Sequence, residues 1–234
     1  MTAAPVDRPG LDPSDIDAWV FDLDNTLYPA DSGLFGHVAE RMTSYIADYF
    51  GIDREEAARR RRQYFLDHGT TLRGLMNEHD LDPAPFLEFV HDVDLSSLAP
   101  DEALVRAVGA LKGRKYVFTN ADGPYARRII ERIGLGEIID DVFDIREAGY
   151  MPKPAPETYT RMIERLAIAP RRAVMVEDMA RNLTPAAALG MTTVWLRTET
   201  PWGTDPAPEG VVHHEIEDLA AWIAGLGSDP DQPG

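Results

Sequence analysis

The chain has 234 residues and no cysteine, and its 23 Lys and Arg against 40 Asp and Glu give a formal net charge of −17. The absence of cysteine excludes disulfides, thiolate metal sites and a cysteine nucleophile. The acidic balance argues against a broad nucleic-acid surface, which needs clustered Lys and Arg. With 44% hydrophobic residues the chain can bury a substantial core, which excludes general disorder. This length suggests one large domain, or one domain with an insertion.

Both ends of the chain are rich in Pro, Gly and Asp, so we expect disordered tails at 1–15 and 226–234. The first residues lack the basic region and apolar stretch of a secretory leader. No apolar run approaches the ~18 residues that a membrane helix needs. These features predict a cytoplasmic protein that binds neither nucleic acid nor membrane.

Short apolar runs predict buried strands, and longer segments with a period of 3.6 residues predict helices. In chain order, the strands are expected at 18–21, 115–119, 142–145, 173–176, 192–196 and 211–216. The helices are expected near 101–112, 124–134, 156–167, 181–189 and 216–225. Alternating strands and helices predict an α/β fold, a Rossmann-like parallel sheet in three layers with helices on both faces.

The stretch from 31 to 98 breaks this alternation, because its pattern is mostly helical. Asp31 and Ser32 are expected to cap a first helix. Asp53 is expected to cap a second helix, with Glu56 three residues later completing a capping box. Pro83 and Pro85 should open a further short helix.

This pattern divides the chain into an α/β core domain, 1–30 with 99–234, and a helical cap domain, 31–98. An insertion after the first strand lies above the carboxyl ends of the strands, where open α/β sheets bind ligands. It is therefore placed to act as a lid or specificity cap.

Two carboxylates, Asp22 and Asp24, directly follow the first predicted strand. Side chains at i and i+2 share a face in extended structure, and two such charges repel unless a cation or proton lies between them. The pattern indicates a hard-metal site with one carboxylate available as a nucleophile. Alone, it is also compatible with a polar turn at a strand end.

Two further strand-end motifs supply groups for an anion. Thr119 and Asn120 end an apolar strand and could bind phosphate oxygens together with backbone N–H groups of the next helix. Lys153 stands between prolines, where a fixed ammonium can neutralise a phosphoryl group or a carboxylate. Taken singly, each motif also reads as an ordinary turn or an exposed lysine in a loop.

Acids also end the strand at 173–176. Asp178 could complete a magnesium shell, with Glu177 or Asn182 holding coordinated water. The alternative is that these acids cap the following helix.

Together, the order Asp22-x-Asp24-x-Thr26, Thr119, Lys153 and Glu177-Asp178 resembles the four motifs of the haloacid dehalogenase-like hydrolases. The resemblance covers about 18–222 and includes the position of the cap. Within that superfamily, Asp24 matches the general acid/base of the phosphatases, which the dehalogenases lack. The resemblance therefore favours phosphoryl transfer.

A finer resemblance lies in four segments, namely 22–29, 69–75, 91–94 and 153–157. They are similar to the pyrimidine 5′-nucleotidase branch, which hydrolyses nucleoside monophosphates such as UMP and CMP. The alternatives are a phosphatase for another small metabolite, such as phosphoglycolate or a sugar phosphate, and a silent binding or regulatory protein on the same scaffold. We expect a monomer or a homodimer.

The resemblance implies a role for each core residue. Asp22 would attack phosphorus and form an aspartyl-phosphate, and Asp24 would protonate the leaving oxygen and then activate water. Mg²⁺ would be held by the Asp22 carboxylate, the Asp24 carbonyl and Asp178. The remaining groups would neutralise the phosphoryl charge or orient Asp24: Thr119, Asn120, Lys153 and Asn25.

In the cap, four residues are candidates for reading the leaving group: Tyr64, Thr70, Thr71 and Arg73. The Thr hydroxyls could hydrogen-bond a pyrimidine edge or ribose, and Tyr64 or Tyr28 could stack on a base. These residues could equally form the core and a turn of the cap.

Overall fold

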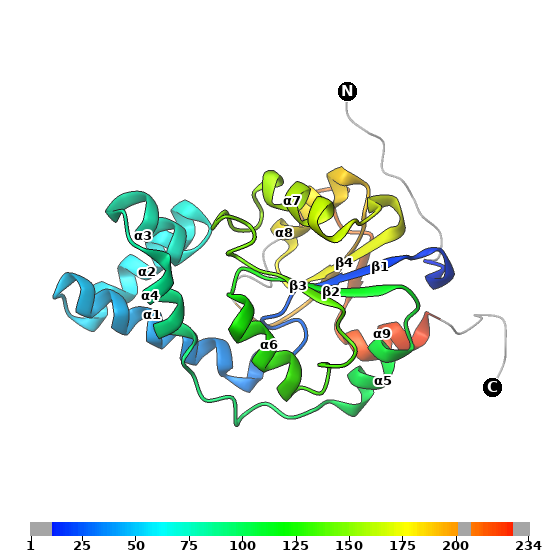
Figure 1. Cartoon of the computed structure of the whole chain (residues 1–234), viewed down its shortest axis with the longest axis horizontal. Coiled ribbons are helices and arrows are strands. Elements are labelled where there is room, and N and C mark those ends of the chain that lie inside the picture. Colours follow the sequence, from blue (N-terminus) through cyan, green and yellow to red (C-terminus); the bar gives the residue numbers. More distant parts are fainter. Residues whose placement is uncertain (1–10, 201–206, 227–234) are drawn as a thin grey trace.

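The computed structural model describes residues 11–200 and 207–226 (Figure 1). Within these residues, six strands form one parallel sheet in the order β3-β2-β1-β4-β5-β6. The strands are β1 (Ala18–Phe21), β2 (Arg114–Phe118), β3 (Asp141–Phe143), β4 (Ala173–Glu177), β5 (Thr192–Leu196) and β6 (His214–Ile216). The predicted α/β fold is thus confirmed.

Helices cover both faces of the sheet (Figure 1). On one face lie α5 (Glu102–Ala110), α6 (Gly123–Arg132) and α9 (Leu219–Gly225), and on the other α7 (Pro156–Leu166) and α8 (Ala180–Leu189). Strand β1 shows why both layers are needed: Trp19 and Phe21 join the apolar cluster on the first face, and Val20 joins the cluster on the second. Side chains alternate across a strand, so an entirely apolar strand must be covered twice.

Two predicted boundaries shift at the end of the chain. The strand expected at 211–216 begins only at His214, because Val211 closes a turn onto the carbonyl of Pro208. The helix expected near 216 begins at Leu219, since the Asp218 carboxylate accepts the N–H of Ala221 at 2.9 Å and so fixes the helix start.

Four helices follow β1 and lie at one end of the molecule (Figure 1). They are α1 (Leu34–Phe50), α2 (Arg54–His68), α3 (Thr71–His79) and α4 (Pro83–His91). We call the stretch 31–98 the helical insertion. Its buried apolar side chains pack on one another, and they include Ile46, Ala57, Leu72, Leu75 and Phe86.

The expected helix starts in the insertion are partly confirmed. Asp53 caps α2 by accepting the N–H of Glu56 at 2.9 Å, but the Glu56 carboxylate accepts from Arg60 rather than completing a capping box. Asp31 and Ser32 belong instead to a short 3₁₀ helix (Ala30–Ser32), and α1 begins after Gly33, whose φ is +73°. A left-handed residue at that point separates the two helices, and glycine adopts it without strain.

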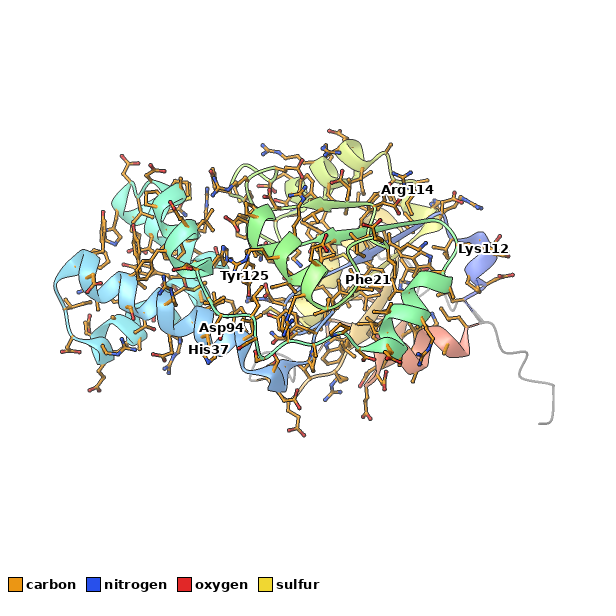
Figure 2. The ribbon with its side chains drawn as sticks, turned by 60° about the horizontal axis from the view of Figure 1, so that its bottom comes forward. Phe21, His37, Asp94, Lys112, Arg114 and Tyr125 are labelled. Carbon is orange, nitrogen blue, oxygen red and sulfur yellow. The ribbon has the colours of Figure 1, made fainter. Side chains whose placement is uncertain are left out.

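The segment that leads from the insertion back to the core is bonded to α6. Arg128 donates to the carbonyls of His91 and Val93 at 3.2 and 3.0 Å. Figure 2 shows His37 of α1 close to Asp94 of the return segment, so the outgoing and returning chains lie side by side. These contacts fix the insertion next to α6.

Within the described residues, no helix is long and apolar enough to cross a membrane. The tails expected at 1–15 and 226–234 fall mostly outside the described part of the chain. Of the first tail, residues 11–15 are described and contain a short 3₁₀ helix (Pro13–Asp15), capped by Asp12.

Candidate active site

The carboxyl ends of three neighbouring strands, β2, β1 and β4, bring three of the four motifs together. The register places Phe21 opposite Val117 of β2 and Val176 of β4, so the residues that follow these strands meet at one edge. The N–H of Asp22 still bonds the Val176 carbonyl, at 2.9 Å. The side chains of Asp22, Thr119, Glu177 and Asp178 are buried there.

Lys153 reaches into this cluster from the loop before α7. Its Nζ lies 2.5 Å from Asp22 Oδ1 and 2.7 Å from Glu177 Oε1, and it donates to the Phe118 carbonyl at 2.9 Å. The Asn120 side chain holds the loop by accepting the Lys153 N–H at 2.8 Å. Lys153 is 2% exposed, so its charge acts on the carboxylates without screening by solvent.

The cluster carries more negative than positive groups. Burial raises the pKa of Asp22 to about 7, although Lys153 acts in the opposite direction. Burial, with Glu177 and Asp22 nearby, raises the pKa of Asp178 to about 9. Burial lowers the pKa of Lys153, but the carboxylates of Asp22 and Glu177 outweigh it and hold that pKa above its ordinary value. One ammonium therefore does not balance the three acids, and the cluster favours a further cation.

The donors fit a hard divalent cation. One carboxylate oxygen from each of Asp22, Glu177 and Asp178 lies within 4.8 Å of the others, and such all-oxygen sets suit Mg²⁺. Glu177 already accepts from Lys153, from the N–H of Met179 and from Asn182 Nδ2. Three donors thus already hold the Glu177 carboxylate in place. The buried Oδ1 of Asn182 has no hydrogen-bond partner among the described residues, which suits an acceptor for a coordinated water.

Asp24 is half-buried, and its side chain is held by tyrosines. Its Oδ1 accepts hydrogen bonds from the hydroxyls of Tyr28, at 2.6 Å, and Tyr125, at 3.3 Å. Burial raises the pKa of Asp24, while the bond from Tyr28 opposes that shift. A carboxyl with a raised pKa beside a candidate nucleophile suits proton transfer.

The turn after Asp24 brings Thr26 back onto the nucleophile. Asn25 adopts a left-handed backbone with φ +62°, which Asn tolerates better than most residues. Thr26 Oγ1 then donates to Asp22 Oδ2 at 3.2 Å. Asn25 therefore shapes this turn through its backbone.

The anion-binding candidates lie at the end of β2. Thr119 is buried, and its Oγ1 accepts the N–H of Ala121 at 3.0 Å, which leaves the hydroxyl proton for a phosphoryl oxygen. Asn120 is half-buried beside it. Asp122 caps the start of α6, so the N-terminus of that helix points toward the same region.

The four insertion candidates divide into two groups. Thr70 caps α3, Thr71 donates to the Arg61 carbonyl, and the Tyr64 hydroxyl lies 2.8 Å from His79 Nε2. These three contacts are internal to the insertion. Arg73 instead lines a cleft of about 400 Å³ between the insertion and the 151–155 loop, together with these residues: Asp67, His68, Gly69, Asn77, Met151, Pro152, Lys153, Pro154 and Ala155.

Sequence reasoning missed the aromatic surroundings of Asp24. Tyr125 was not singled out, His91 entered only as part of the segment 91–94, and Tyr28 was considered for stacking on a base rather than for contact with Asp24. Tyr125 and His91 lie 101 and 67 positions beyond Asp24 in the chain. The only signal in the sequence is a Tyr in the first turn of a helix, which is too common to single out a site.

Comparison with known proteins adds a family and several relatives. A family model described as haloacid dehalogenase-like hydrolase matches residues 16–190. Phosphate metabolism protein 8 of Saccharomyces cerevisiae is 24% identical over 187 residues, which cover 73% of this chain but 58% of that relative. The chain thus spans less than two thirds of that protein.

Two other similarities bear on the fold and the site. Fructose-1-phosphate phosphatase YqaB of Escherichia coli is 30% identical over 128 residues, 52% of this chain and 67% of that protein. A phosphatase of known structure from Thermococcus onnurineus, with 22% identity, superposes with a TM-score of 0.61 over 91% of this chain and 98% of its own. At that identity the superposition shows a shared fold.

Proposed function

The chain belongs to the haloacid dehalogenase-like hydrolases, and on that basis we propose that it hydrolyses phosphate monoesters through an aspartyl-phosphate. One observation carries the proposal: Asp24, an acid that two hydroxyls hold in place, stands two residues after the candidate nucleophile Asp22. An ester oxygen needs a proton to leave, whereas a halide does not. The name of one relative, a fructose-1-phosphate phosphatase, agrees with this reaction.

In the first half of the reaction, Asp22 attacks phosphorus and the bond to the leaving oxygen breaks. Asp24 gives its proton to that oxygen as it departs. Lys153 and the Thr119 hydroxyl neutralise charge on the other phosphoryl oxygens. In the second half, Asp24 takes a proton from water as the water oxygen bonds to phosphorus. The bond from phosphorus to Asp22 then breaks, and inorganic phosphate leaves.

Asp22, Asp178 and the Asp24 carbonyl would hold Mg²⁺, which supplies positive charge to the phosphoryl group when bound. The acid cluster fits this role because Lys153 alone does not balance it. Glu177 and Asn182 would orient coordinated water.

We further propose that residues 31–98 act as a cap over the core, 1–30 with 99–234, and that the substrate is a nucleoside monophosphate such as UMP or CMP. The motif pattern supports this substrate, and the cleft beside Arg73 and Lys153 offers polar groups for a leaving group. Thr70, Thr71, Tyr64 and Asn120 stay candidates for binding it. A sugar phosphate is the second candidate, because a fructose-1-phosphate phosphatase is 30% identical. The cytoplasmic location and the oligomeric state stay predictions.

The test is phosphate release from UMP, CMP, fructose 1-phosphate and phosphoglycolate, with Mg²⁺ and with EDTA. Asp22→Asn is the inactive variant, and Asp17→Asn, which alters an exposed acid paired with Arg172, is its matched control. Mg²⁺-dependent release from UMP and CMP above the other esters would support the whole proposal. Preference for fructose 1-phosphate would move the substrate to the second candidate. No release from any ester, with wild-type folding intact, would overturn the phosphatase assignment.

A further inference from the structure

Asp24 is held asymmetrically. Tyr28 follows it on the loop after β1, and Tyr125 comes from the first turn of α6, yet both hydroxyls donate to the same carboxyl oxygen, Oδ1. Both tyrosines are buried, at 3% and 2% exposure. Burial and the nearby Asp24 charge hold the pKa of each phenol above its ordinary value, so both groups stay protonated donors. An oxygen that accepts two hydrogen bonds is a poor place for a proton, which therefore belongs on Oδ2.

We propose that Tyr28 and Tyr125 are positioning residues that fix Asp24 so that Oδ2 carries the transferred proton. The inference rests on the proposed function and deepens it. As the ester bond breaks, the proton on Oδ2 passes to the leaving oxygen. Oδ2 then receives a proton from the attacking water, while Oδ1 stays bonded to both tyrosines throughout. The two tyrosines hold the carboxyl in one orientation and need not touch the substrate.

The helical insertion contributes to the same arrangement through His91, the last residue of α4. The His91 ring stacks on the Tyr125 ring, with centroids 4.3 Å apart and planes 14° from parallel. Its Nδ1 lies 3.0 Å from Asp122 Oδ1. Asp122 also caps α6 by accepting the N–H of Tyr125 at 3.2 Å. The ring and the backbone of Tyr125 are therefore both fixed by groups in contact with the insertion.

Figure 2 shows Tyr125 where the insertion meets the core. Because Arg128 ties the return segment to α6, the insertion and Tyr125 belong to one set of contacts. The position of His91 thus bears on the orientation of Asp24 through a single intermediate side chain.

Ordinary packing of buried tyrosines does not account for this geometry. Tyr116 shows the ordinary case: it is 7% exposed, and its hydroxyl donates to the Leu166 carbonyl at 3.4 Å on the other face of the sheet. Tyr28 and Tyr125 instead converge on one oxygen of the candidate acid. Tyr116→Phe is therefore a matched control, since it removes a buried hydroxyl that does not touch Asp24.

The experiment compares kcat/KM for two esters, p-nitrophenyl phosphate and phenyl phosphate. The nitrophenolate group leaves without accepting a proton, whereas the phenolate group leaves much faster when it accepts one. The ratio of the two kcat/KM values reports the step in which the ester bond breaks, so the later activation of water does not affect it. The proteins are the wild type, Tyr28→Phe, Tyr125→Phe, the double variant, Asp24→Asn and Tyr116→Phe. Circular dichroism and thermal unfolding check that each variant is folded.

If the tyrosines position Asp24, Tyr125→Phe and Tyr28→Phe each lower kcat/KM for phenyl phosphate about tenfold more than for p-nitrophenyl phosphate. The double variant then approaches Asp24→Asn, whose selective loss should be about 10²–10⁴, the usual range of general acid–base catalysis. Tyr116→Phe leaves the ratio unchanged. Equal losses on both esters, or no loss, would overturn the inference and assign the tyrosines to packing alone. Wild type inactive on both esters would instead overturn the proposed function.

Discussion

Replacing Lys153 with Met removes the positive charge from the centre of the acid cluster at nearly constant volume. Lys153 is 2% exposed and contacts Asp22 at 2.5 Å and Glu177 at 2.7 Å, so both carboxylates lose their counter-charge while staying buried. Breaking a buried ion pair from one side costs about 3–5 kcal/mol. At about 2–4 °C per kcal/mol for a chain of this size, the midpoint of thermal unfolding should fall by about 6–20 °C.

The pH dependence gives a second, independent mark of this effect. Without Lys153, the pKa of Asp22 rises further above its unfolded value near 4, because burial already raises it and the lysine that opposed the shift is gone. An acid with a raised folded pKa binds more protons in the folded state, so stability falls as pH rises. The deficit of the variant should therefore be smaller at pH 5 than at pH 8.

The assay is thermal and urea unfolding of wild type and Lys153→Met in EDTA, at both pH values. Arg172→Met is the control: Arg172 pairs with Asp17 at the surface, where an ion pair contributes about 0–1 kcal/mol. Phosphate release should be lost in the Lys153 variant and kept in the control. A Lys153 variant no less stable than the Arg172 variant, or one with a deficit that is constant with pH, would refute the reasoning.

Three further changes test other parts of the molecule. Asp22→Asn should lower phosphate release at least about 1,000-fold with an unchanged circular dichroism spectrum, and near-normal turnover would exclude Asp22 as nucleophile. Gly74→Ala should cost about 1–3 kcal/mol in urea unfolding, because the added Cβ would lie 2.5 Å from Tyr64 Cβ, and a neutral result would contradict the α2–α3 packing. Asp122→Ala should cost about 1–2 kcal/mol at pH 7 by removing the α6 cap. Burial raises the pKa of Asp122, but its bonds to His91 and to the Tyr125 N–H outweigh this and lower it, so the stability difference should shrink as pH falls below about 4.

The helical insertion contacts the site in two places. Arg73 faces the cleft that Lys153 also lines, and His91 stacks on Tyr125 near Asp24. The proposed leaving-group recognition and proton transfer thus draw on two consecutive helices of the insertion, α3 and α4. A mutation in the insertion that changes the substrate preference is therefore expected to change the rate of ester cleavage as well as the affinity for the substrate.

Sequence patterns predicted that Asp22, Thr119 and Asp178 lie at one edge of the sheet, because each closely follows an apolar run. An apolar run fixes a strand, and the polar residues that follow it must lie at the carboxyl edge of a parallel sheet. Taken singly, Thr119, Lys153 and Asp178 matched ordinary turns, caps or loops, and they were chosen as a set because the four motifs together resemble those of one family. The register of β1 with β2 and β4 then brings them together.

Local patterns were less informative in the insertion. Tyr64, Thr70 and Thr71 have side chains suited to a ligand, but the same groups also serve helix caps and buried contacts, and three of their hydrogen bonds lie inside the insertion. Asp31 matched the pattern of a helix cap, yet Gly33 moved the start of α1. A residue type shows what a side chain can bond, whereas the neighbouring elements decide which bond forms.

The sequence by itself determined the α/β fold, the place of the insertion and the acids and lysine of the core, since hydrophobic periodicity and strand-end motifs are properties of short segments. Only the tertiary structure decided how Asp24 is held. Tyr28 lies four residues away, but Tyr125 reaches Asp24 from α6, and His91 at the end of α4 stacks on Tyr125. Such contacts depend on how whole elements pack, and spacing along the chain does not encode them.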